Sequence, residues 1–251
     1  MLRKRLIPTL LLREGRLVKG VGYRNHRDAG RPETTARAHD AQSADEIVIL
    51  DIDASRDARP PDFKALGLVA AECFMPVTMG GGIRSRDDAC RAMDAGADKI
   101  TITTTALDNP SLIGDLARLL GAQAVVLGVD VWRSGSEHLI YDFRTDRTRR
   151  DRDVMSWIGE AVDRGAGEIR LMSAESEGKR CGMDLELIAG VKKRFKVPVV
   201  AEGGAGTLEH LAEGLEAGAD GVCVGTMLVF SDNNLVKIRR FLNSRGCELR
   251  A

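Results

Sequence analysis

The chain has 251 residues, and its 37 Lys and Arg residues balance 37 Asp and Glu residues, which leaves a formal net charge of zero. This balance argues against a nucleic-acid-binding protein that depends on phosphate contacts, because such a protein carries an excess of basic residues. Hydrophobic residues make up 43% of the chain, which argues against disorder and predicts a substantial core. A length of about 250 residues fits one large α/β domain as well as two small ones.

The cysteine and histidine content indicates a reducing compartment and no metal centre. The five cysteines are odd in number and include no C-x-x-C pair, which is typical of free thiols in the cytoplasm rather than of a disulfide framework. The four histidines show no metal-ligand spacing. We therefore predict neither a bound metal nor another cofactor.

The N-terminal sequence MLRKRLIPTLLL is basic and then apolar, as a secretory signal peptide is. Its apolar run is short, contains Pro8 and lacks a small-residue cleavage site before Arg13, so we interpret it as a first β-strand. The sequence has no apolar run of about 18 residues, which predicts no membrane-spanning helix. We expect a cytoplasmic protein that binds neither membranes nor nucleic acid.

Short runs rich in β-branched residues alternate along the chain with amphipathic segments. The predicted strands are Arg5–Leu11, Glu46–Asp51, Pro76–Met79, Lys99–Thr103, Ala124–Asp130, Glu168–Ser173, Pro198–Ala201 and Gly221–Gly225. The clearest predicted helices are Arg86–Ala95, Leu112–Leu119, Leu185–Phe195, Leu208–Glu216 and Leu235–Leu242. Repeated strand–helix units in about 250 residues predict an α/β fold of one domain over residues 1–251, a single (β/α)8 TIM barrel.

An internal repeat supports this fold. The tetrapeptide AGAD begins at Ala95 and again at Ala217, which lies 122 residues later. The same offset aligns further features: Pro76 with Pro198, Gly81-Gly82 with Gly203-Gly204, and Glu46-Ile47 with Glu168-Ile169. Because the offset is close to half the chain, we infer two homologous half-barrels rather than two independent domains.

Each half carries a pattern suited to an anion. A strand ends in consecutive glycines, Gly81-Gly82 or Gly203-Gly204, and the next strand ends in small residues. Glycine lets the backbone approach an anion closely, and the helix that follows presents unpaired N–H groups. The plain alternative is a tight turn, which a duplicated pattern makes less favourable. Two such sites at one barrel mouth predict an elongated ligand with a phosphate at each end.

Six motifs in chain order carry a resemblance to a known family: IPTLLLREGRLVKG, EIVILDIDAS, MPVTMGGGIRS, AGADKITI, GVDVWRSG and VPVVAEGGAG. Together they resemble the cyclase subunit of imidazole glycerol phosphate synthase, the HisF family, over essentially the whole chain. The Lys19-Gly20 ending of the first motif and the chain length favour HisF over its isomerase sister HisA. The resemblance implies a lyase-type synthase subunit that receives ammonia from a HisH-like glutaminase through the barrel and uses it on a bisphosphate at the mouth.

In this family a ring of charged residues closes the bottom of the barrel. The chain matches all four ring positions, with Arg5, Glu46, Lys99 and Glu168. The resemblance implies that the ring is an ammonia gate, and that Asp98 faces the glutaminase partner. The plain alternative is a ring that only stabilises the barrel, because charges at the bottom of such barrels usually concern folding.

The chain departs from the family at the residues that carry the cyclase reaction. The family uses one aspartate at the end of the first strand and one at the end of the fifth. Asp130 matches the second position, and the resemblance gives it a catalytic role together with Lys19, which would hold an anionic ligand from a flexible loop. The first position is Leu11, which removes half of the acid–base pair because leucine transfers no proton.

Further departures lie around the predicted mouth. Thr103 stands for a family asparagine, Glu202 for a serine, and Glu177-Gly178 for the acid after the sixth strand. Glu175 and Glu202 add negative charge that would repel a phosphate or suit a less anionic, nucleotide-sugar-like substrate. The predicted phosphate- and substrate-binding residues are Gly81, Gly82, Thr103, Thr104, Gly178, Gly203, Gly204, Gly225, Thr226 and Asp51.

Three other features leave their roles open. Asp51 and Asp53 line the predicted mouth, or they only bond to the loop after the second strand. The charged run RTRRDRD at residues 147–153 predicts a solvated loop at the mouth, or a phosphate clamp. Trp132 and Tyr141 flank that run and either pack against it or stack on a sugar or base.

The triple leucine after Pro8, with LDIDAS and ECFMPV, resembles a HisF-like branch associated with surface-polysaccharide clusters. In that branch the protein works with a HisH-like glutaminase and a third protein to convert a sugar acetamido group to an acetamidino group. We therefore expect an ammonia-using synthase subunit outside histidine biosynthesis. The alternatives are an ordinary cyclase of histidine biosynthesis and a non-catalytic scaffold that activates a glutaminase.

Overall fold

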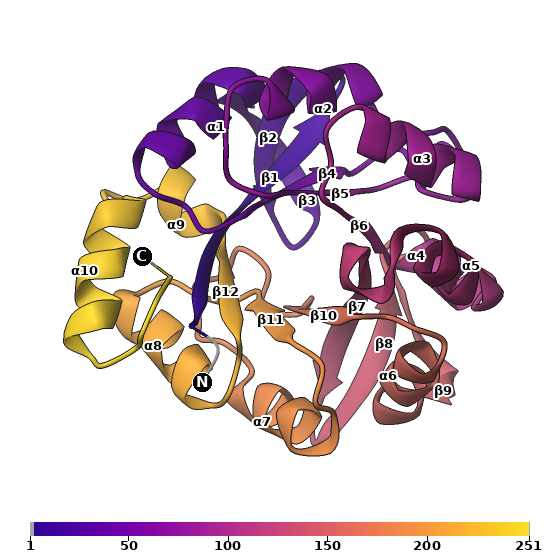
Figure 1. Ribbon diagram of the computed structural model, residues 1–251. Helices are drawn as coiled ribbons and strands as arrows, with labels where there is room; N and C mark the ends of the chain where they lie inside the picture. The colour runs from indigo at the N-terminus through magenta and orange to yellow at the C-terminus, as the bar shows by residue number, and fades with distance from the viewer. Residues whose placement is uncertain (1–2, 251) are drawn as a thin grey trace.

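Eight parallel strands close into a barrel in the computed structural model, which describes residues 3–250 (Figure 1). They are β1 (Arg5–Arg13), β4 (Ile47–Asp51), β5 (Val77–Gly80), β6 (Lys99–Ile102), β7 (Val125–Ser134), β10 (Glu168–Ser173), β11 (Val199–Glu202) and β12 (Gly221–Val224). The barrel closes where β1 pairs with β12, with Arg5 opposite Gly221. The predicted (β/α)8 fold is confirmed, and each predicted strand lies within a few residues of the observed one.

Helices surround the strands and alternate with them along the chain (Figure 1). The helices that follow the barrel strands are α1 (Pro32–Ala41), α2 (Phe63–Ala70), α3 (Arg86–Asp94), α5 (Ser111–Leu120), α6 (Val154–Asp163), α7 (Leu185–Arg194), α8 (Leu208–Glu216) and α10 (Leu235–Ser244). Two short helices, α4 (Thr104–Asp108) and α9 (Thr226–Val229), begin directly after β6 and β12. Among the described residues, no helix is both long enough and apolar enough to cross a bilayer.

The repeat extends to the boundaries of the elements. Strands β5 and β11, helices α3 and α8, and strands β6 and β12 have the same bounds when shifted by 122 residues. The caps repeat too, because the Ser85 side chain accepts a hydrogen bond from the Asp88 N–H and the Thr207 side chain accepts one from the His210 N–H. The two halves of the chain therefore fold as matching half-barrels.

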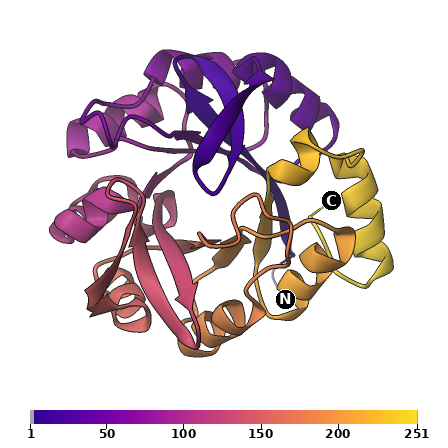
Figure 2. The ribbon, with the colours of Figure 1, turned by 180° about the vertical axis from the view of Figure 1, so that it is seen from behind.

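Two β-hairpins at the barrel mouth were not predicted. Strands β2 (Arg16–Val21) and β3 (Arg24–Gly30) follow β1, and β8 (Glu137–Asp142) and β9 (Arg147–Asp153) follow β7, again about 122 residues later (Figure 2). The prediction of a solvated loop over RTRRDRD is wrong, since these residues form β9, which pairs with β8 in an antiparallel ladder. The alternation of apolar residues that signals a strand is absent here, because both faces of β9 are largely exposed.

Side chains that alternate along each strand divide the core into two parts. The larger part lies between the strands and the surrounding helices. A smaller cluster, formed by Ile7, Val48, Val200 and Cys223, lies inside the barrel with Leu50 packed against it. This inner cluster separates two sets of charged residues, one at the start of the strands and one at their ends.

Candidate active site at the barrel mouth

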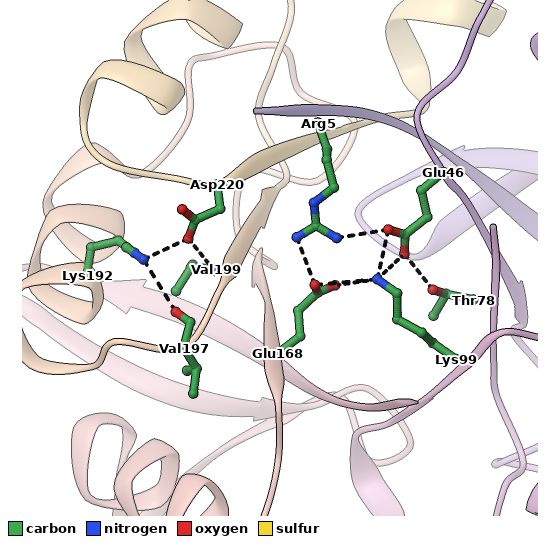
Figure 3. Close-up of polar contacts among 9 residues, drawn as sticks. All are labelled: Arg5, Glu46, Thr78, Lys99, Glu168, Lys192, Val197, Val199 and Asp220. Carbon is green, nitrogen blue, oxygen red and sulfur yellow. Dashed lines mark hydrogen bonds and ion pairs between the residues drawn. The ribbon is translucent and has the colours of Figure 1, made fainter. Parts of the chain in front are cut away.

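The four charged residues at the start of the strands form a closed ring, hereafter the bottom ring (Figure 3). The Arg5 guanidinium lies 2.8 Å from both Glu46 and Glu168, and the Lys99 ammonium lies 2.8 Å from Glu46 and 3.2 Å from Glu168. Thr78 donates a further hydrogen bond of 2.6 Å to Glu46. The sequence therefore brings all four predicted positions together, from β1, β6, β10 and the residue before β4.

The bottom ring is electrostatically balanced. Glu46 is only 2% exposed, and its burial opposes ionisation. The charges of Lys99 and Arg5 and the hydrogen bonds to this carboxylate outweigh that cost, so the pKa of Glu46 is lowered. Two cations and two carboxylates thus neutralise one another across the bottom of the barrel.

Asp98, predicted to face a partner, has an exposed side chain beside the bottom ring. One of its oxygens accepts a hydrogen bond of 2.8 Å from the Val77 N–H. Its repeat equivalent, Asp220, accepts 2.9 Å and 2.7 Å bonds from the Val199 N–H and from Lys192 (Figure 3). Part of the role of Asp98 is therefore local, since both aspartates hold the start of a neighbouring strand.

A pocket opens at the opposite end of the barrel, where the parallel strands end. It extends from the Gly81-Gly82 side, past Leu11, Asp130 and Arg170, to Glu177 and Glu202. A second pocket continues from Glu177 and Glu202 to the other glycine pair. The residues that line both pockets are Lys19, Met172, Glu177 and Glu202. The two predicted anion sites thus lie on either side of a shared centre.

The paired glycines are required by close backbone approach. Gly81 and Gly204 both have a positive φ, at 84° and 82°, which disfavours any residue with a Cβ atom. A Cβ on Gly81 would lie 2.0 Å from the Asp51 carbonyl oxygen, and one on Gly204 would lie 1.9 Å from the Gly182 carbonyl oxygen. The tight-turn alternative is therefore enough to explain why these positions are glycine. The same turns also form the two ends of the site.

The other predicted substrate residues lie beside these turns. Thr103 and Gly225 precede α4 and α9 with nearly the same backbone conformation, φ −120° and −132°. Thr104 and Thr226, the first residues of these helices, are both buried. Gly178 lines the second pocket. Among the predicted substrate residues, each one at one end of the site has its counterpart 122 residues along the chain, except Gly178 and Asp51.

Asp130 and Leu11 both line the first pocket. Asp130 is 6% exposed, and no ion pair reaches it within residues 3–250. Burial raises the pKa of its carboxyl, Arg170 lowers it and Glu202 raises it, and the result is a pKa of about 6. Asp130 therefore exchanges a proton near neutral pH, whereas the Leu11 side chain offers none.

A buried ion pair that we did not predict lies next to Asp130. Arg170, on β10, places its Nε and Nη2 atoms 2.7 Å and 2.6 Å from one oxygen of Glu202, on β11. Burial opposes the charge on Arg170, but Glu202 and Asp130 outweigh it and the pKa of the guanidinium is raised. The sequence does hold a signal for Arg170. Side chains along a strand alternate between its two faces, and Arg170 lies two residues after Glu168, which points into the barrel.

Lys19 lies on β2 and is buried, at 7% exposed, so the prediction of a flexible loop is wrong. Residues 16–21 pair with both β1 and β3, which fixes this segment as a strand. The Lys19 ammonium forms an ion pair with Glu177, from the turn after β10. The acid after the sixth strand therefore neutralises this lysine.

Asp51 and Asp53 bond to nearby segments. Asp51 accepts bonds of 2.6 Å and 2.8 Å from Arg59 and one of 3.1 Å from the Asp62 N–H. Asp53 accepts bonds of 2.7 Å and 3.0 Å from Arg13. The alternative of loop hydrogen bonding thus describes their contacts, although both residues also line the pocket.

The two hairpins meet above Asp130 through aromatic rings. Tyr23, in the β2–β3 turn, lies 5.5 Å from the Tyr141 ring and 6.3 Å from the Phe143 ring, which is stacked on it. Trp132 packs against Tyr141, also at 5.5 Å. Trp132 and Tyr141 therefore pack the hairpin, as one of the two alternatives predicted. An ion pair between Arg24 and Asp146 joins the two turns.

Comparison with known proteins agrees with this architecture. A family model described as "Histidine biosynthesis protein" matches residues 5–234. Imidazole glycerol phosphate synthase subunit HisF of Exiguobacterium sibiricum is 42% identical over 250 residues, with 100% of both chains covered. The subunits HisF of Wolinella succinogenes and Streptomyces coelicolor are 38% and 40% identical, with 98–99% of this chain and 98% of each relative covered. The chain belongs to the HisF family.

Proposed function

We propose that this chain is the ammonia-using subunit of a two-component glutamine amidotransferase, acting on an elongated substrate with phosphate at each end. The observation that carries the proposal is the pair of repeat-related glycine turns, each lining one of two pockets that share several residues. The HisF relatives are named as subunits of imidazole glycerol phosphate synthase. A reaction of that type is the first candidate for this chain.

The two anion sites can be tested without a substrate. Inorganic phosphate, followed by ³¹P NMR, should bind at two sites per chain. Thr104→Val should weaken one site and Thr226→Val the other, because each threonine is buried beside one glycine turn. Thr148→Val on the exposed strand β9 is the control, and two unaffected sites in both Thr104→Val and Thr226→Val would contradict the proposal.

The proposed partner is a HisH-type glutaminase that docks at the bottom ring and supplies ammonia through the barrel. Glutamine labelled with ¹⁵N in its amide group should pass its label to the product of the complex. Lys99→Met should lower glutamine-dependent activity more than activity supported by added ammonium, because it opens the ring between Glu46 and Glu168. Lys192→Met, a pair-breaking change on the same face, should lower neither.

A second candidate is favoured by Leu11 in the pocket. In this reading the chain acts outside histidine biosynthesis, and its ammonia serves acetamidino-sugar formation in surface polysaccharide, with or without chemistry in the barrel. Complementation of a strain that lacks its HisF cyclase separates the two candidates. Growth supports the histidine reaction, and a failure to grow despite a stable complex with the glutaminase supports the second candidate or a scaffold.

A further inference from the structure

Leu11 stands where the family has the first-strand aspartate, so Asp130 lacks an acid–base partner unless another carboxylate reaches the same centre. Glu202 is placed to do so. It lines both pockets, so it lies at the junction between the two predicted phosphate sites. A reacting carbon in the middle of an elongated substrate would lie at this junction.

Register places Glu202 and Asp130 at one level of the barrel. Asp130 on β7 pairs with Met172 on β10, and Met172 pairs with Glu202 on β11. The two acids are therefore two strands apart, or about 10 Å between their backbones. Position 11 lies on β1, on the far side of the pocket, so the second carboxylate approaches from a new direction.

The Arg170 contact leaves Glu202 able to react. Both guanidinium bonds go to the same Glu202 oxygen, Oε2, and within residues 3–250 no protein group donates to Oε1. Arg170 itself is 5% exposed, so it fixes the orientation of the Glu202 side chain from inside the barrel. Glu202 lines the pocket that Lys19 and Glu177, already paired with each other, also line.

We propose that Glu202, positioned by Arg170, supplies the second carboxylate of the mouth and accepts the proton of the incoming ammonia, with Asp130 as its acid partner. This inference rests on the proposed function. Ammonia nitrogen forms a bond to a carbonyl carbon of the substrate, and the C=O electron pair moves to oxygen. Glu202 takes one proton from the new C–NH3⁺ group, and Asp130 donates one to the oxygen, which leaves a C(OH)–NH2 centre.

The test uses the full chain with ammonium chloride as nitrogen source and the bisphosphate substrate of imidazole glycerol phosphate synthase. Glu202→Gln should lower kcat by about 100-fold or more, the usual contribution of a positioned acid or base, with KM changed by less than about threefold. Adding Leu11→Asp to Glu202→Gln should recover at least about tenfold. Glu175→Gln, which removes a carboxylate outside both pockets, should leave kcat unchanged.

A kcat of Glu202→Gln within about threefold of the parent would overturn the inference and leave the proposed function intact. No turnover by the parent chain would instead contradict the proposed reaction on this substrate. In that case the ¹³C carboxyl titration of Asp130 still decides the inference. Its midpoint should fall in Glu202→Gln, because the negative neighbour is lost, and an unchanged midpoint would show that the two acids do not act as a pair.

Discussion

The barrel interior holds charged groups at both ends, and the two ends differ in balance. The bottom ring has two cations and two carboxylates, each bonded to both opposite partners. The pocket at the mouth is lined by four cations, Arg13, Lys19, Arg56 and Arg170, and by five carboxyls, Asp51, Asp53, Asp130, Glu177 and Glu202. Four of these carboxyls have an ion-pair partner, and within residues 3–250 Asp130 has none.

This difference explains the opposite pKa shifts of two buried carboxyls, one at each end. The pKa of Glu46 in the bottom ring is lowered, whereas that of Asp130 is raised to about 6. Both are buried, so burial alone does not separate them. What separates Glu46 from Asp130 is the number of cations within reach of each carboxyl. A carboxyl without a cation partner in a cleft is typical of a catalytic site.

Breaking the bottom ring should give the largest effect on stability. Glu46→Ala removes the acceptor for Arg5, Lys99 and Thr78 and leaves the buried Arg5 and the half-buried Lys99 with one carboxylate. Its free energy of unfolding, measured by urea denaturation at pH 7, should fall by about 3–5 kcal/mol. Glu216→Ala, which breaks a half-exposed pair with Arg245, should cost less than about 1 kcal/mol. Equal losses in the two variants would mean that the bottom ring does not act as a unit.

Removing Arg170 from the mouth should lower the free energy of unfolding somewhat less than breaking the bottom ring does, because the pocket admits water. Arg170→Met leaves Glu202 and Asp130 without a compensating charge, and the loss at pH 8 should be about 2–4 kcal/mol. At pH 5 the loss should be smaller, since protonation of Asp130 relieves the repulsion. The Asp130 carboxyl should titrate above about 6 in this variant, because Arg170 lowers its pKa in the parent. A loss of unfolding free energy that does not change with pH would contradict a surplus of negative charge at the mouth.

Asp130→Asn should stabilise the protein at high pH. The folded pKa of about 6 lies above the ordinary value of 3.8, so the unfolded chain releases this proton more readily. The resulting stability is fully present below pH 3.8 and is lost as the pH rises through 6, at most about 3 kcal/mol. The variant should therefore gain in free energy of unfolding at pH 8 by up to that amount and gain little at pH 4. Denaturation curves at the two pH values check this, and a gain at pH 4 alone would contradict it.

The sequence predicted the strands and the bottom ring well because both carry strong signals. Runs such as Val125–Val129 are buried on both faces, and the 122-residue offset fixes which strands correspond. The two hairpins gave no such signal, because β3 and β9 are polar edge strands whose order depends on their neighbours. Composition therefore predicted a loop at residues 147–153, and the resemblance placed Lys19 in a loop at the first hairpin.

The sequence predicted which residues lie at the mouth but not which of them form ion pairs. Glu202 and Glu177 were recognised as departures that add negative charge, yet each has a buried cation opposite it. Arg170 was overlooked because pairing across neighbouring strands depends on their register, which a single sequence does not give. The charge surplus at the mouth, and with it the raised pKa of Asp130, becomes visible only once these pairs are assigned.

Breaking the ion pair between the two hairpins should have the smallest effect on stability. This result would show that the comparison between the two ends of the barrel applies to buried charges only. Arg24 and Asp146 are 71% and 56% exposed, so water screens their attraction. Arg24→Ala should leave the urea midpoint unchanged, whereas Tyr23→Ala, which removes the ring that contacts Tyr141 and Phe143, should lower it. If Arg24→Ala lowered the midpoint as much as Tyr23→Ala does, exposed charges would hold the hairpins together. The distinction between a balanced bottom ring and a surplus mouth would then no longer account for where charge matters in this barrel.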